Sequence, residues 1–167
     1  MSLLQVEEVT VRFGGLTAVD GASFTVESGT VSGLIGPNGA GKTTLFNVIT
    51  GLQPPTDGRI LLDGVDITRR RPHRRARLGV ARTFQRLEVF GSLTAKENVL
   101  VALEMRRRWQ RTGGDLSAEA DALLDRVGIA DVAERRVELL PTGTARLVEV
   151  ARALATGPKL LLLDEPS

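Results

Sequence analysis

The N-terminal part of the chain carries a pattern of apolar and β-branched residues that predicts strands. Four segments have this pattern: residues 4–13, 18–26, 31–35 and 59–62. The segment 31–35 is short and almost entirely apolar, which is typical of a buried strand. Gly14-Gly15 ends the first segment, and Asp63-Gly64 after the fourth predicts a hairpin turn. We therefore expect a β-rich N-terminal region.

A glycine-rich loop and a helix interrupt this region. The loop covers residues 36–41, and residues 43–50 after it have the pattern of a helix that ends at Gly51. A Pro- and Gly-containing turn at residues 54–58 then leads back to a strand. The order is therefore strand, glycine-rich loop, helix, strand.

The C-terminal part has helical spacing instead. Apolar residues recur at helical intervals over residues 92–156, with a break at residues 111–115. Candidate N-caps are Ser92, Thr94 and Ser117, and candidate C-terminal stops are Gly128 and Gly157. A short strand is expected at residues 79–84 and a buried parallel strand at residues 159–163. Together the elements predict an α/β fold with a helical insertion.

Length and composition narrow the class of protein. With 167 residues, 42% hydrophobic and 25% charged, the chain has the make-up of one globular domain. The longest apolar run, residues 160–163, is too short to span a bilayer, and the N-terminus lacks the pattern of a secretory signal. The absence of cysteine and the single histidine exclude disulfides, thiolate metal sites and multi-histidine metal sites. This composition fits a reducing, cytoplasmic location.

Basic residues cluster at residues 69–77, which contain six arginines and His73. Such a stretch is typical either of a surface that binds nucleic acid or anionic lipid, or of a solvated helix face. We favour the solvated face, because no aromatic residues interleave as stacking platforms and the net charge is only +2. For a second basic stretch, residues 106–111, a coupling role and a plain surface role stay open.

Residues 36–43 match the phosphate-binding P-loop pattern G-x-x-x-x-G-K-[ST], in the required context between a strand and a helix. The glycines let the backbone wrap around phosphates, and the helix N-terminus adds a partial positive charge. Lys42 would reach the β- and γ-phosphates, and the Thr43 hydroxyl would bind Mg²⁺. The alternative is a glycine-rich turn that caps an ordinary helix. The candidate nucleotide-binding residues are Gly36, Pro37, Asn38, Gly39, Ala40, Gly41, Lys42, Thr43 and Thr44.

Two acidic residues, Asp164 and Glu165, follow the apolar run at residues 160–163. A carboxylate at the end of a buried strand can face a P-loop, where Asp164 would hold Mg²⁺. Glu165 would polarise the attacking water as general base. Alone, the segment is equally well explained as a buried strand that ends in acidic residues. The P-loop upstream makes the nucleotide site the better interpretation.

With these motifs the chain resembles the ATP-binding subunit of ABC transporters. Thr83-Phe84-Gln85 is similar to the family's Q-loop, which implies that Gln85 contacts Mg²⁺ or the water. Phe13 stands where the family's adenine-stacking aromatic lies, although core packing explains this residue equally well. Residues 140–154 resemble the signature helix, in which Gly143 and Thr144 would contact ATP held by a second subunit.

The resemblance narrows to the ATPase subunits of branched-chain amino-acid importers. The phrases that carry it lie at residues 12–20, 36–44, 46–47, 50–51, 79–85 and 93–102. It implies an α/β P-loop NTPase fold of the ABC type, with an N-terminal antiparallel β subdomain, a helical insertion and the C-terminal part missing. The expected parts are a β subdomain with the P-loop core over 1–90, a helical subdomain over 91–140, and the signature-like helix with the Walker B strand over 141–167.

The implied function is ATP binding and hydrolysis with Mg²⁺, energising an importer of branched-chain amino acids or similar solutes. Lys42, Gln85 and Glu165 would be catalytic, and Thr43, Gln85 and Asp164 would hold the metal. The implied partners are a second ABC ATPase subunit, identical or different, and membrane permease subunits, with no nucleic acid expected. The implied location is cytoplasmic, peripheral on the inner face of the cell membrane.

The chain departs from the family pattern at two places. The signature usually reads Leu-Ser-Gly-Gly-Gln, but here Pro141 replaces the serine and offers neither a hydroxyl nor an N–H group. The sequence also ends before the family's switch histidine, which His73 cannot be because it precedes the Q-loop. We therefore expect marginal stability and weak ATP hydrolysis from these residues alone. Two alternatives stay open: a soluble ABC ATPase acting on nucleic acid, and a nucleotide-binding fragment without turnover.

Overall fold

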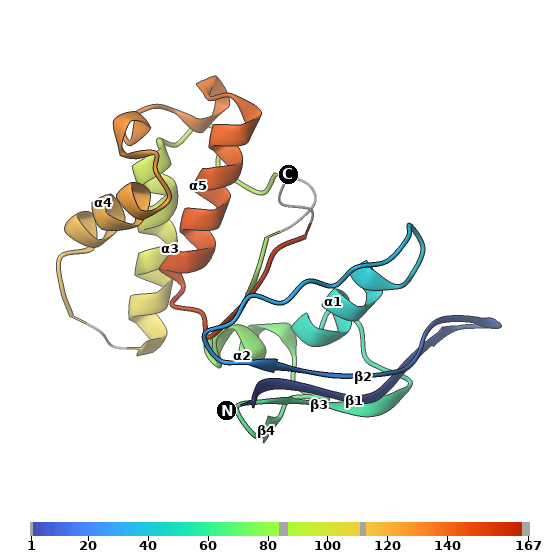
Figure 1. Cartoon of the computed structure of the whole chain (residues 1–167). Coiled ribbons are helices and arrows are strands. Elements are labelled where there is room, and N and C mark those ends of the chain that lie inside the picture. Colours follow the sequence, from blue (N-terminus) through green and yellow to red (C-terminus); the bar gives the residue numbers. More distant parts are fainter. Residues whose placement is uncertain (1, 84–86, 111–112, 165–167) are drawn as a thin grey trace. The chain divides into compact units, whose positions relative to one another are not determined.

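The structure is a computed structural model that describes residues 2–83, 87–110 and 113–164. The chain forms two compact units, residues 1–80 and 81–167 (Figure 1). The first contains β1 (Ser2–Phe13), β2 (Leu16–Glu27), α1 (Lys42–Thr50), β3 (Asp57–Leu62), β4 (Val65–Asp66) and α2 (Pro72–Arg77). The second begins within β5 (Val80–Arg82) and contains α3 (Ala95–Gln110), α4 (Leu116–Arg126), η1 (Ala130–Val132), η2 (Val137–Leu139), α5 (Thr142–Ala155) and β6 (Leu160–Leu162).

The first unit is built on a four-stranded antiparallel sheet with the order β2-β1-β3-β4. In its register Leu4 lies opposite Leu62, and Val6 lies opposite Ile60. All four side chains are buried, because alternate positions of a strand point to the same face of the sheet. The predicted antiparallel β subdomain is therefore confirmed, with β1 and β2 as its long strands (Figure 1).

Helix α1 follows the glycine-rich loop, as predicted. It ends at Gly51, whose φ of 82° is a left-handed conformation that glycine adopts without strain. Its buried face consists of Leu45, Val48 and Ile49. The opposite side of its first turn is open, and the Thr43 side chain is exposed.

The prediction of a buried strand at residues 31–35 was wrong. The segment is irregular in the structure, and Val31 and Ile35 are almost fully exposed, at 103% and 95%. A strand needs a neighbour for its backbone hydrogen bonds. None of the described strands of this unit pairs with residues 31–35, since the sheet ends at β2 and β4. An apolar run thus indicates the tendency to be buried but not the partner that buries it.

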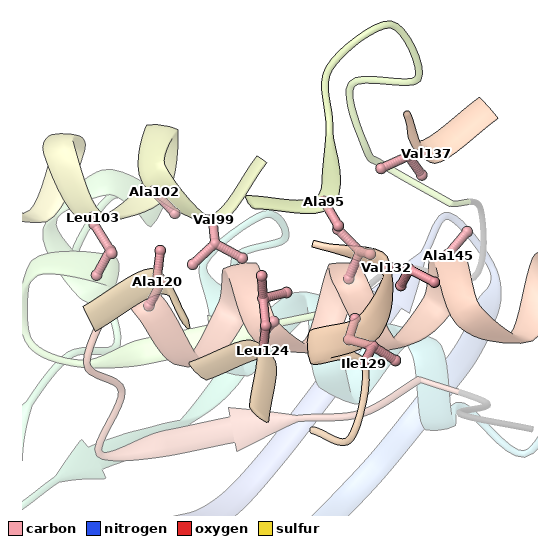
Figure 2. Packing of buried hydrophobic residues seen from close by; sticks show 13 residues of the cluster. Ala95, Val99, Ala102, Leu103, Ala120, Leu124, Ile129, Val132, Val137 and Ala145 are labelled. Atoms are coloured by element: carbon pink, nitrogen blue, oxygen red, sulfur yellow. The ribbon is translucent and has the colours of Figure 1, made fainter. Parts of the chain in front are cut away.

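The second unit has its core between three helices, α3, α4 and α5 (Figure 2). The buried cluster has one or more side chains from each of these helices and from η1 and η2, among them Val99, Leu103, Leu124, Val132 and Val148. Full burial of a leucine or valine contributes about 1.5–3 kcal/mol relative to exposure. The helical spacing over residues 92–156 is therefore confirmed as one packed helical core.

Two helices of this core begin with side-chain caps. At α3, the Glu97 N–H donates to Thr94 Oγ1 (3.1 Å) and the Thr94 N–H donates to Glu97 Oε2 (2.7 Å), which is a capping box. At α4, Asp115 Oδ1 accepts from the N–H groups of Ser117 (2.9 Å) and Ala118 (3.2 Å). The predicted cap at Thr94 is confirmed, whereas Ser117 is not the cap of α4 because Asp115 satisfies its first amides.

Ion pairs link α3 to α4. Lys96 Nζ lies 2.8 Å from Asp121, and Arg106 lies 2.7 Å from Glu119. The hydrogen bond from Lys96 to Asp121 raises the pKa of Lys96 above its ordinary value.

No helix in the described part of the chain has the length and apolar character needed to cross a bilayer.

Candidate functional site

The P-loop lies directly against strand β2. Gly41 has φ 82°, and a Cβ atom at this position would lie 2.4 Å from the carbonyl oxygen of Ala18. Both the backbone conformation and the close approach therefore require glycine at this position. Gly39 has φ 83° but open space around it, so only its conformation favours glycine.

The start of α1 has unsatisfied amides. Its N-cap is Gly41, which has no side chain to accept a hydrogen bond, and no side-chain cap is formed. The first backbone bond of the helix runs from Leu45 N–H to Gly41 O (2.8 Å), so the amides of Lys42, Thr43 and Thr44 lie before the helical ladder. Such amides and the helix dipole together favour a bound anion.

Lys42 folds over the same loop. Its Nζ donates to the carbonyl oxygens of Gly36 (2.6 Å) and Pro37 (2.8 Å). These are neutral acceptors, and an anionic oxygen forms a hydrogen bond about twice as strong with an ammonium group. The loop thus holds one cationic side chain beside open amides, which suits a phosphate group.

Phe13 is available to a ligand. It ends β1, and 49% of its surface is exposed. It lies opposite Leu16, which is 67% exposed. The alternative of core packing does not fit this exposure. An exposed aromatic face can stack on a planar base without base-specific contacts.

In the second unit, Asp164 is held by β5. Its Oδ2 lies 2.6 Å from a terminal guanidinium nitrogen of Arg82, and the two side chains are only 11% and 5% exposed. The N–H of Asp164 points to Thr83 Oγ1 at 3.4 Å, and Thr83 N–H donates to Leu162 O (3.0 Å). The end of β6 is therefore fixed by two successive residues of the β5 segment.

Arg82 is the residue that sequence reasoning missed. In the sequence it stands within the family-like segment 79–85, and its residue type alone indicates no role. An arginine inside the short apolar segment 79–84 was the available signal, since a buried arginine needs an acidic or carbonyl partner. The predicted site residues Gln85 and Glu165 lie outside the described residues.

The signature-like segment starts helix α5. Pro141 is the N-cap and forms no side-chain cap, and Gly143 is exposed with open space around it. Thr144 is partly buried. The first turn of α5 therefore has uncapped amides, as does that of α1.

Of the six arginines at residues 69–77, one is structural. Arg75 is 2% exposed, and its guanidinium donates to the carbonyl oxygens of Val48 (2.6 Å), Ile49 (2.9 Å), Thr68 (2.8 Å) and Arg70 (2.8 Å). Its burial lowers the pKa of the guanidinium. The solvated-face interpretation is wrong for Arg75, which satisfies carbonyls at the end of α1, and holds for the other five.

Two of the predicted magnesium ligands lie among the described residues, one in each unit. Mg²⁺ in such sites takes one or two protein oxygens, with phosphate oxygens and water as its other ligands. Among the described residues, Asp164 offers a carboxylate and Thr43 a hydroxyl. No group of three or more His, Cys, Asp or Glu side chains that could hold a metal ion occurs among the described residues.

Comparison of the sequence and the fold with known proteins identifies the family of this chain. The ABC transporter family model matches residues 19–167. The chain is 41% identical to the high-affinity branched-chain amino acid transport ATP-binding protein BraF of Pseudomonas aeruginosa and 39% identical to LivG of Escherichia coli K12, over 99% of this chain and 69% of each relative. It is also similar to the ADP conformation of MJ1267, an ATP-binding cassette, with a TM-score of 0.87, 34% identity and coverage of 99% of this chain and 69% of that one. The chain therefore belongs to the ABC transporter family.

Proposed function

We propose that this chain binds ATP with Mg²⁺ and hydrolyses it to energise an importer of branched-chain amino acids or similar solutes. The observation that carries the proposal is the start of α1, where three uncapped amides lie beside the Lys42 ammonium group. The loop before this helix requires glycine at position 41. The family match supports ATP as the ligand, and the names of BraF and LivG support the class of solute.

Each site residue has a distinct role in this proposal. Lys42 and the loop amides bind the phosphates, and Phe13 stacks on the adenine. Thr43, Gln85 and Asp164 would hold Mg²⁺, which would neutralise charge on the phosphates. Glu165 accepts a proton from the attacking water as general base.

The partners belong to the same proposal. The open first turn of α5, with Gly143 and Thr144, would contact ATP held by a second ABC ATPase subunit. Permease subunits at the inner face of the membrane would contact the outer side of α3. A shallow groove there is lined by apolar and charged side chains: Leu93, Glu97, Leu100, Val101, Glu104, Met105 and Arg108.

Binding of a fluorescent ADP derivative, measured with and without Mg²⁺, tests the nucleotide site. The wild-type chain should bind it more tightly with Mg²⁺. K42A should weaken binding by about 10–10²-fold, because a hydrogen bond to a charged group contributes about 1.5–3 kcal/mol. K96A is a matched control, because Lys96 pairs with Asp121 on the helices and should leave the affinity unchanged. Equal binding by wild type and K42A would contradict the proposal.

Transport tests the solute and the partners. Cells that lack the ATPase subunit of a branched-chain amino-acid importer would receive either the wild-type chain or D164N, and leucine uptake would be measured. Uptake restored by the wild type alone supports the coupling role. Restoration by neither, with ADP binding intact, favours the second candidate, binding without turnover, which Pro141 at the start of α5 supports because it offers no N–H group.

A further inference from the structure

The C-terminal end of helix α1 receives a positive charge from another helix of the same unit. Helix α1 has no basic residue in its own last turn. Arg75 of helix α2 supplies one, because its guanidinium donates to the carbonyl oxygens of Val48 (2.6 Å) and Ile49 (2.9 Å) near the end of α1. Helix α1 and Arg75 both lie within residues 1–80, the first compact unit.

The charge of Arg75 is buried and is compensated by carbonyl groups. The residue is 2% exposed, and its other hydrogen bonds run to the carbonyl oxygens of Thr68 and Arg70, both at 2.8 Å. No carboxylate among the described residues forms an ion pair with it. Burial lowers the pKa of this guanidinium, and the charge of Asp66 offsets part of that effect.

The end of α1 holds this guanidinium in one place. A Cβ atom at Gly51 would lie 2.7 Å from Arg75 Nε, so the glycine leaves the space that the guanidinium fills. A helix of nine residues is about 14 Å long, and the charge of Arg75 is therefore fixed at about that distance from the amides at the start of α1.

We propose that the buried charge of Arg75 acts through helix α1 and strengthens the binding of phosphate at the opposite end of this helix. The C-terminal end of a helix carries about half a negative charge, which opposes an anion at the N-terminal end. The full positive charge of Arg75 more than offsets it. Arg75 is a positioning residue, because it contacts the helix and acts through it.

This inference rests on the proposed function, since it takes the start of α1 as the phosphate site. K42A separates the two. If K42A binds ADP as tightly as the wild type, the start of α1 is not the nucleotide site and both the proposed function and the role of Arg75 fail. If K42A weakens binding and removal of the Arg75 charge does not, only the role of Arg75 fails.

The experiment measures the dissociation constant of the fluorescent ADP derivative without Mg²⁺, at about 0.15 M salt. R75Q removes the buried charge and should weaken binding by about fivefold or more, the value that Coulomb's law gives for about three negative charges at about 14 Å even with the dielectric constant of water. R74Q is the matched control: it removes a neighbouring exposed charge, which salt screens beyond about 8 Å, and should bind like the wild type. R75Q that binds as tightly as R74Q overturns the proposal.

Two comparisons separate the charge from a structural role. R75K loses the planar fork but keeps a charge, so R75K and R75Q should both lower stability in urea, and only R75Q should weaken ADP binding at a pH where the new ammonium group is charged. Fluorescent AMP, ADP and ATP carry increasing negative charge, so the loss of affinity in R75Q should grow in that order. Equal losses in R75K and R75Q, or equal losses for the three nucleotides, overturn the proposal.

R75K alone covers the case in which R75Q does not fold. Burial lowers the pKa of a lysine, and NMR of the new ammonium group gives the pH at which it loses its proton. The dissociation constant of R75K relative to the wild type should rise as the pH increases through that value, because the arginine of the wild type stays charged. A ratio that stays constant while the ammonium group loses its proton overturns the proposal.

Discussion

The four longer helices among the described residues begin in two different ways. Helices α3 and α4 start with side-chain caps, at Thr94 and Asp115. Helices α1 and α5 start at Gly41 and Pro141 without any side-chain cap. Helices α3, α4 and α5 share the packed helical core, so core membership does not explain the difference. The uncapped starts of α1 and α5 are the two segments with a phosphate-binding or signature-like pattern. Helix α2 also lacks a side-chain cap, so an open start alone does not identify a ligand site, and the proposed site at α1 depends on the P-loop and Lys42 as well.

Removal of Lys42 is the strongest way to test the open start of α1. K42A should weaken ATP binding by about 10–10²-fold, as expected for loss of one hydrogen bond to a charged group. The stability of the chain should change little, because Lys42 contacts only the carbonyls of its own loop. Isothermal calorimetry with Mg-ATP and urea unfolding measure the two effects. A large loss of stability with unchanged affinity would make Lys42 a structural residue.

Two glycines of the P-loop allow the cost of a left-handed backbone conformation to be measured apart from the cost of a steric clash. Both Gly39 and Gly41 have φ near 80°, and a residue with a Cβ in this conformation loses about 1–2 kcal/mol. G41A should cost more than G39A, because its Cβ would also lie 2.4 Å from the Ala18 carbonyl, whereas Gly39 has open space. Urea unfolding of the two variants measures the difference. Equal losses would show that the loop does not lie against β2 as described.

Two threonines at helix starts should behave in opposite ways. T94A removes a cap and should lower the free energy of unfolding by about 1 kcal/mol without changing nucleotide affinity. T43V removes an exposed hydroxyl that forms no cap, and should reduce the effect of Mg²⁺ on nucleotide affinity without changing stability. Chemical unfolding and ADP binding on both variants test the pair. Reversed outcomes would contradict the division between capped and open starts.

The smallest expected effect is a change in the pH dependence of stability, caused by Lys96 in the first turn of α3. Its bond to Asp121 raises its pKa above the ordinary value of 10.5. The stabilisation from this pair is therefore fully present below pH 10.5 and is lost as the pH rises through the raised folded-state pKa. K96M and D121N should both flatten the fall of stability above pH 10.5, measured by urea unfolding. A fall as steep as that of the wild type in either variant would exclude the pair as its source.

Local patterns in the sequence predicted most of the fold because their causes are local. Helical spacing, the Thr94 cap and the stops at Gly51, Gly128 and Gly157 depend on neighbours a few residues away, and all three stops have positive φ. The P-loop motif likewise carries its own backbone requirement.

The rest depended on distant partners. The apolar segment 31–35 was expected to be a buried strand, but no described strand of its unit pairs with it. Arg75 was expected to be solvated, but carbonyls of Val48 and Ile49 bind it from far along the chain. Arg82 pairs with Asp164 across a longer separation, 82 residues. A sequence pattern shows a charged residue or an apolar run, but it does not show which distant residues that segment contacts in the fold.

Amide hydrogen exchange with and without Mg-ADP tests most directly whether the open start of α1 is an anion site. Ligand should slow exchange at the amides of residues 39–44, which lack a cap, and leave residues 95–98 at the capped start of α3 unchanged. Protection confined to the α1 start, and absent in K42A, is the predicted result. Saturating Mg-ADP that leaves residues 39–44 unprotected would contradict the assignment of this loop as the nucleotide site.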